Sequence, residues 1–179
     1  MQPIEQLEQL GPHLGAVVAN IRPEQLTAPT PCAELTVQGV LEHMIVGATA
    51  FATAFRDGVP AEPDLGDPLG SFGSALGDLV AAINEPGALD RTLTTPFGTM
   101  DGETFARYVA LDGIVHGWDL ATATGQRYEP PVELVATIDS FARGFLEPRR
   151  DGHTFADAVP PAAGASPIEQ LANFTGRRS

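Results

Sequence analysis

The segment DGIVHGWDLATATG, residues 112–125, sets the strongest constraint on the fold. It carries Asp112, His116 and Asp119 at helical spacing, within about 60° of one another on one helix face. Phe105 and Val109 extend the same face, so the helix would direct two carboxyl groups and an imidazole toward an apolar interior. A buried carboxylate is costly unless it is paired, protonated or bound to a metal. The fold must therefore bring partners to these side chains.

Apolar spacing predicts about five helices and no convincing run of alternating strand residues. The expected helices cover approximately residues 4–21, 36–56, 72–83, 101–125 and 132–146. A short further helix and a tail are expected in the closing PIEQLANFTGRRS. Thr36 and Asp101 are suited to be N-caps, and Gly125 is suited to be a C-cap. We therefore expect an all-α fold that forms a single domain over residues 1–179.

The charge balance excludes several kinds of partner. The chain has 23 Asp and Glu against 10 Lys and Arg, a net charge of -13. Such a field repels phosphate backbones and anionic lipid surfaces, so we expect no nucleic-acid and no membrane partner. No signal peptide or long uncharged apolar run is present, which favours a cytoplasmic protein. Cys32 is the only cysteine, which excludes an internal disulfide, and we expect it to be buried and inert.

One further histidine could complete a metal site. His43 lies at the margin of the apolar face of the expected 36–56 helix. If that helix neighbours the 101–125 helix, His43, Asp112 and His116 could hold a divalent ion and leave a position open for water or a thiolate. Asp119 could then orient a ligand histidine through its other ring nitrogen. The alternative is a metal-free interior with two ion pairs, Asp112 with His116 and Asp119 with an arginine.

Small residues occupy the opposite face of the 101–125 helix. They are Ala110, Gly113, Gly117, Ala121 and Thr124. Interior glycines cost helix stability, so their clustering indicates that the backbone of another helix approaches closely there. We favour packing within the chain over the alternative, which is a homodimer contact.

Three segments resemble one protein family. PTPCAELTVQGVLEHMIVGATAF resembles a pattern in which a Pro-Thr-Pro-Cys turn leads into a helix with Leu-x-His. VHGWDLATATGQ matches the family's central block almost residue for residue, and FADAVPPAAGASPIEQLANFTGRRS resembles its closing segment. The chain thus resembles actinobacterial metal-binding proteins related to the N-terminal domain of mycothiol-dependent maleylpyruvate isomerase, among the DinB-like proteins. The resemblance implies a DinB-like up-down four-helix bundle with an additional short C-terminal helix and tail.

The resemblance also implies a ligand set. In these relatives a histidine on the second helix and a Glu-x-x-x-His pair on a later helix hold a divalent metal, usually taken as zinc. By position these ligands are His43, Asp112 and His116. Asp112 replaces the family's glutamate and is one methylene shorter, so the metal would lie closer to the backbone or be reached through water. The isomerase has a further C-terminal domain, for which we expect no counterpart in this chain, so we do not expect maleylpyruvate isomerisation itself.

The expected function follows from this ligand set. We expect a metal-dependent transferase or isomerase in which a low-molecular-weight thiol such as mycothiol attacks a small electrophile. A divalent ion favours the thiolate, which is the nucleophilic form of a thiol. The alternative is a non-catalytic module that binds a metal or a ligand.

Overall fold

The computed structural model describes residues 1–32, 35–59, 61–95, 97–150 and 156–178. In these residues the chain is mostly helical. The helices are α1 (Pro3–Ala19), α2 (Val37–Arg56), α3 (Pro68–Ile83), α4 (Gly102–Thr124), α5 (Val132–Leu146) and α6 (Pro167–Phe174). Short 3-10 turns lie at Pro23–Gln25, Ala88–Asp90 and Glu147–Arg149. Two strands, β1 (Thr92–Thr95) and β2 (Gly98–Asp101), pair as an antiparallel hairpin.

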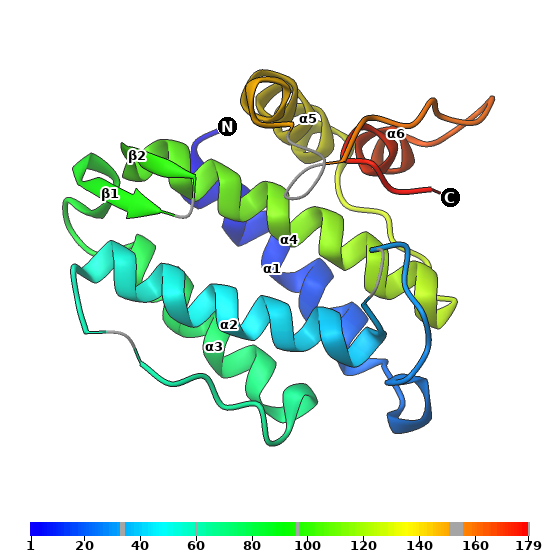
Figure 1. The fold of residues 1–179 in the computed structure, drawn as a ribbon, viewed down its shortest axis with the longest axis horizontal. Helices are drawn as coiled ribbons and strands as arrows, with labels where there is room; N and C mark the ends of the chain where they lie inside the picture. Colours follow the sequence, from blue (N-terminus) through cyan, green and yellow to red (C-terminus); the bar gives the residue numbers. More distant parts are fainter. Residues whose placement is uncertain (33–34, 60, 96, 151–155, 179) are drawn as a thin grey trace.

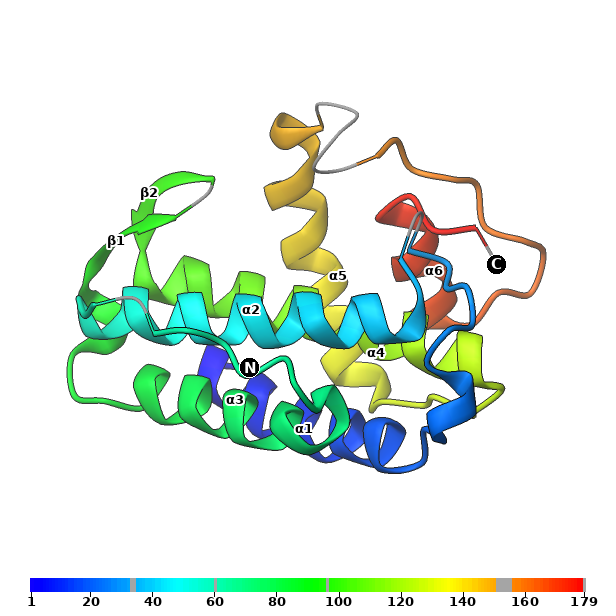
Figure 2. The ribbon, with the colours of Figure 1, turned by 60° about the horizontal axis from the view of Figure 1, so that its bottom comes forward.

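The helices lie in layers around α4. Figure 1 shows α2 and α4 running side by side, with α5 and α6 on the far side of α4 from α2. The turned view in Figure 2 shows α1 and α3 together in a layer beneath α2 and α4. In this arrangement α1 packs against α4, and α3 packs against α2. Because it has neighbours on both sides, α4 is buried along most of its length.

The predicted helix caps are confirmed. The Thr36 side chain accepts a hydrogen bond from the backbone N–H of Gly39, and Asp101 accepts one from Thr104. Gly125 ends α4 in the left-handed conformation, with φ of 69°. The start of α3 was predicted too late. It begins at Pro68 because proline is preorganised for the first helical position and the preceding aspartate caps the helix.

The hairpin corrects the expectation of an all-α fold. Each strand has four residues, and Leu93 and Thr95 are the buried positions of β1. An alternation this short is indistinguishable from loop sequence, which is why the periodicity did not reveal it. The hairpin has a clear role at the start of α4. Asp101 is the last residue of β2 and also the N-cap of that helix.

The small face of α4 packs within the chain, as predicted. A Cβ added to Gly113 would lie 3.1 Å from Leu10 Cδ2 of α1. One added to Gly117 would lie 2.8 Å from Leu14 Cδ2 and 2.5 Å from the Tyr128 hydroxyl oxygen. The close approach is therefore made by side chains of α1 and of the segment after α4.

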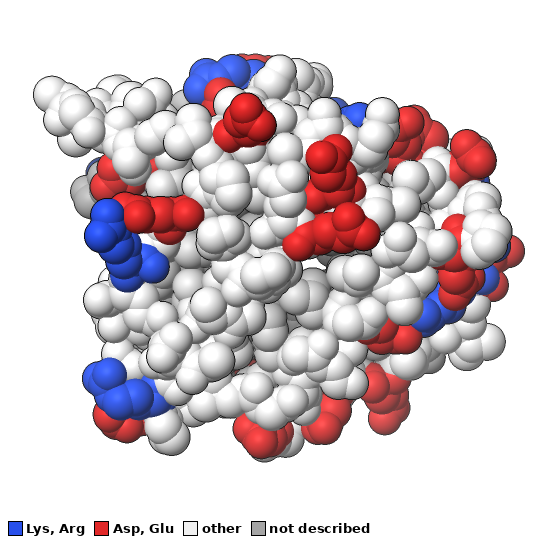
Figure 3. Space-filling model, turned by 180° about the vertical axis from the view of Figure 1, so that it is seen from behind, with Lys and Arg blue, Asp and Glu red and all other residues white. Residues whose placement is uncertain are grey.

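The surface agrees with the acidic composition. Figure 3 shows acidic side chains scattered around the face opposite to that of Figure 1, with a largely uncharged centre. Among the described residues, no helix combines the length and hydrophobicity needed to cross a membrane.

We predict that Gly117→Ala destabilises the protein by about 1–3 kcal/mol, because the new methyl group overlaps Tyr128 and Leu14. Gly15→Ala is the matched control on α1, where an added Cβ meets nothing within 4 Å. That control should stabilise the helix by about 0.5–1 kcal/mol. Urea unfolding of both variants measures the difference, and equal effects would contradict the packing at Gly117.

Candidate metal centre

The packing of α2 beside α4 brings the three predicted ligands together. One ligand atom from each of His43, Asp112 and His116 lies within 4.8 Å of the others. The two imidazole rings have centroids 4.9 Å apart and an interplanar angle of 67°. His116 is buried, Asp112 is half-buried, and His43 is exposed at the edge. The cluster therefore opens to the surface on the α2 side.

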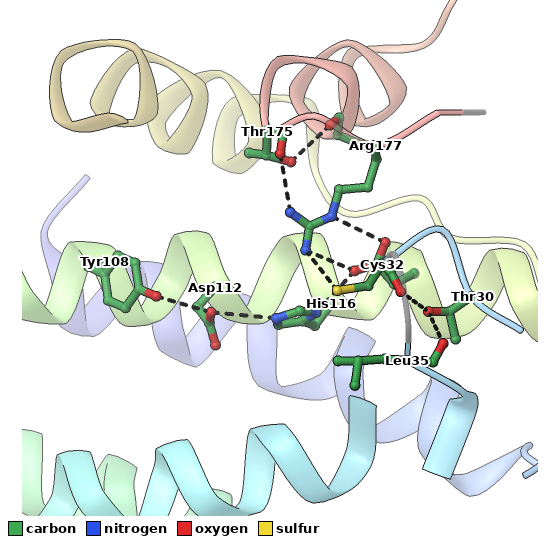
Figure 4. A network of polar contacts seen from close by, with 10 residues as sticks. Thr30, Cys32, Leu35, Tyr108, Asp112, His116, Thr175 and Arg177 are labelled. Carbon is green, nitrogen blue, oxygen red and sulfur yellow. Dashed lines mark hydrogen bonds and ion pairs between the residues drawn. The ribbon is translucent and has the colours of Figure 1, made fainter. Parts of the chain in front are cut away.

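Asp119 determines the tautomer and the orientation of the His116 imidazole. The Asp119 side chain is fully buried, and His116 Nδ1 lies 3.0 Å from Asp119 Oδ2. A carboxylate only accepts hydrogen bonds, so Nδ1 carries the proton and donates it. In the neutral ring this leaves the lone pair on Nε2, the nitrogen that faces Asp112 (Figure 4). This is the tautomer that a metal ligand requires.

The gap between Nε2 and Asp112 suits a shared ion. His116 Nε2 and Asp112 Oδ1 are 3.6 Å apart, which is too far for a hydrogen bond. Two atoms that each lie about 2.0–2.1 Å from one tetrahedral zinc are about 3.3–3.4 Å apart. The observed spacing is compatible with a shared ion and equally with an ion pair between the two side chains.

Arg177 is the arginine that pairs with Asp119. Its Nη2 lies 3.2 Å from Asp119 Oδ2, and its Nε lies 3.4 Å from Oδ1. The tail after α6 carries it there, since the Arg177 backbone N–H donates to the Ala172 carbonyl at 3.0 Å. The side chain also donates to the Thr175 carbonyl at 3.3 Å. The buried carboxylate thus has a cation as well as an imidazole as partners.

Cys32 belongs to the same network, and the expectation that it is buried and inert is wrong about its position. It is half-buried, and Arg177 Nη2 lies 3.7 Å from its Sγ (Figure 4). Burial raises the pKa of the thiol, and the guanidinium opposes that rise. Cys32, His116 and Asp119 form a second group with metal-ligating atoms close together. The Arg177 cation already contacts two of its members, so this group is a poor metal site.

Neighbouring side chains support the first group. The Tyr108 hydroxyl donates to Asp112 Oδ1 at 3.3 Å, and burial together with the Asp112 carboxylate raises the pKa of Tyr108. Tyr108 therefore stays protonated and holds the Asp112 side chain. Loss of hydration lowers the pKa of His43, the nearby His116 and Arg177 lower it further, and Asp112 opposes them. A neutral imidazole is the form that binds metals.

The cluster lies at one end of a cleft with a volume of about 460 Å³. Its polar end consists of Cys32, His43, Asp112, His116 and Arg177. The rest of the wall is mainly apolar, and it comes from α2, α4, the end of α5 and the hairpin turn. A cleft of this size accepts a small organic molecule.

Sequence reasoning missed three residues of this centre. Tyr108 could have been found, because it lies four residues before Asp112 on the same helix. Cys32 and Arg177 come from segments 145 positions apart, and they meet Asp119 only through tertiary packing. Single-sequence spacing carries no signal for such contacts.

Comparison with known proteins identifies one matching domain family and two similar full-length proteins. Residues 7–73 match the family model of the mycothiol maleylpyruvate isomerase N-terminal domain. The chain is 32% identical over 181 residues to the uncharacterized protein Rv0738 of Mycobacterium tuberculosis (strain ATCC 25618 / H37Rv), covering 99% of this chain and 98% of that protein. The uncharacterized protein MT0763 of strain CDC 1551 / Oshkosh is similar to the same extent. No solved structure matches the chain.

The fold and the cluster define a mainly helical protein with a candidate metal centre between α2 and α4. Given the domain match and the full-length relatives, the chain belongs to the mycothiol maleylpyruvate isomerase N-terminal domain family. The resemblance inferred from the sequence is thereby confirmed. Of the three candidate ligands, His43 lies inside the matched residues, whereas Asp112 and His116 lie beyond them.

We predict that Arg177→Ala destabilises the protein by about 3–5 kcal/mol, because it removes the cation from a buried carboxylate. The exposed neighbour Arg178 is the matched control, and Arg178→Ala should change stability by less than about 0.5 kcal/mol. Chemical unfolding of the two variants gives the comparison. Equal stability of the two variants would mean that burial of the Asp119 carboxylate does not require Arg177.

Proposed function

We propose that this protein binds a divalent metal ion, zinc, through His43, Asp112 and His116, and that Asp119 orients His116. The observation that supports this most is the convergence of three ligand atoms within 4.8 Å around an imidazole whose Nε2 is free to coordinate. Two histidines and a carboxylate are a donor set that zinc accepts. Three protein ligands are also the number typical of a catalytic zinc, which keeps one position for water or substrate.

The proposed activity is thiol chemistry on a small electrophile, as a transferase or an isomerase. When bound, zinc supplies Lewis acidity that lowers the pKa of a coordinating thiol. The family name supports a low-molecular-weight thiol of the mycothiol type as the co-substrate. A cytoplasmic location suits such a thiol, because the cytoplasm keeps thiols reduced.

The chain's own residues would prepare the site for this chemistry. Asp119 and Arg177 hold the His116 ring, and Tyr108 holds the Asp112 carboxylate. The apolar wall of the cleft limits the water around the reacting groups. We also propose that α1–α4 correspond to the up-down four-helix bundle of DinB-like proteins, which the pairing of α1 with α4 and of α2 with α3 supports.

Metal content tests the ligand assignment. Asp112→Ala should weaken zinc binding by more than about 100-fold, since losses of 10–100-fold are already typical for residues that merely support a ligand. Asp112→Glu restores the family's residue and should preserve or strengthen binding. The exposed Asp90 is the control, and Asp90→Ala should leave zinc affinity unchanged. Zinc titration by calorimetry measures all three, and unchanged affinity in Asp112→Ala would remove Asp112 from the site.

Activity tests the rest of the proposal. Zinc-loaded protein, incubated with mycothiol and a panel of small electrophiles, should accelerate conjugation or isomerisation over the same protein treated with a chelator. Stoichiometric zinc with no acceleration across the panel would contradict the enzymatic role. The protein would then be a non-catalytic metal-binding module.

A further inference from the structure

The cleft has two chemically different halves. Next to the candidate ligands it is polar, but farther along it is walled by Val46, Ala50, Phe51, Phe97, Leu111 and Leu146. Aromatic side chains are in contact along this wall. The ring centroids of Phe97 and Tyr108 are 4.6 Å apart, and those of Phe51 and Tyr108 are 6.2 Å apart. Such a surface suits an apolar or ring-shaped group.

Apart from the proposed zinc at its polar end, the cleft offers little to a negatively charged group. The chain contains no lysine, and among the residues that the structure describes, Arg177 is the one arginine that lines this cleft. A guanidinium has five N–H donors. Here Nε and Nη2 bond to Asp119, Nη2 also contacts Cys32, and Nη1 bonds to the Thr175 carbonyl. Arg177 is therefore engaged by the protein itself.

An anion at the apolar end, away from the proposed zinc, would lose part of its hydration and gain no cation in return. Leaving a carboxylate unpaired in an apolar setting costs several kcal/mol. Asp112 lies in the same cleft, and the net charge of -13 adds long-range repulsion. An uncharged ring of the same shape loses little hydration and gains contact with Phe51 and Phe97. The cleft should thus discriminate between ligands by charge.

We propose that the electrophile accepted by this cleft carries an uncharged, apolar, ring-sized group that packs on the apolar wall, with no carboxylate at that end. This inference rests on the proposed function, because only that function makes the bound molecule an electrophile. Binding of its ring-sized group to the apolar wall requires neither the metal nor the thiol. It narrows the substrate class of the candidate centre to electrophiles that carry a neutral, hydrophobic group.

A matched pair of unreactive ligands tests the inference. 2-Naphthamide and 2-naphthoate have nearly the same shape and differ in charge. In the chelator-treated, zinc-free protein, we expect the amide to bind at least tenfold more tightly, with NMR shifts at backbone amides of Val46–Phe51. Equal or tighter binding of the naphthoate, shifts elsewhere, or binding of neither ligand would overturn the inference. Loss of zinc binding with the amide preference intact would count against the proposed function alone.

A charge variant makes the test independent of ligand solubility. Ala50 lines the cleft and is exposed, so Ala50→Arg adds an unengaged cation to the wall without burying it. That variant should reduce the preference for the amide at least fivefold. Ala81 is exposed on α3 away from the cleft, so Ala81→Arg makes the same charge change elsewhere and should keep the wild-type preference. An equal response in the two variants would overturn the role of the wall.

Discussion

The buried Asp119 carboxylate is the interaction on which the centre depends. It has no solvent exposure, and it receives His116 Nδ1 on one side and Arg177 on the other. The first contact turns Nε2 toward Asp112, and the second ties the tail after α6 to α4. Because removing the cation from a buried carboxylate is costly, docking of the tail stabilises Asp119 on α4. One ion-pair network therefore couples the C-terminal segment to the orientation of a candidate ligand.

The sequence predicted the part of this centre that lies on one helix. Asp112, His116 and Asp119 share a face because of helical spacing alone, and the caps at Thr36, Asp101 and Gly125 followed from side-chain chemistry and glycine's tolerance of positive φ. Contacts between segments that are distant in the sequence could not be predicted from helical spacing. The identity of Arg177 as the partner and the position of Cys32 depend on how the tail docks. The hairpin was missed because four-residue strands are too short to show a period.

The same helix packing accounts for the two halves of the cleft. The glycines on one side of α4 admit α1 closely, which leaves the other side of α4 to face α2, α5 and the tail. Polar residues from α2 and α4 meet at one end, and aromatic residues from α2 and the hairpin turn meet at the other. A polar end beside an apolar wall is the arrangement that the proposed thiol chemistry on a hydrophobic electrophile would use. Membership of the mycothiol maleylpyruvate isomerase N-terminal domain family is consistent with that chemistry.

The proposed metal ligands are His43, Asp112 and His116, and not Cys32, His116 and Asp119. Zinc-edge X-ray absorption of the zinc-loaded, thiol-free protein distinguishes the two groups directly. With the proposed ligands, zinc should have nitrogen and oxygen neighbours at about 2.0–2.1 Å, including two imidazoles, and no sulfur. A sulfur neighbour at about 2.3 Å would identify Cys32 as a ligand and contradict the account.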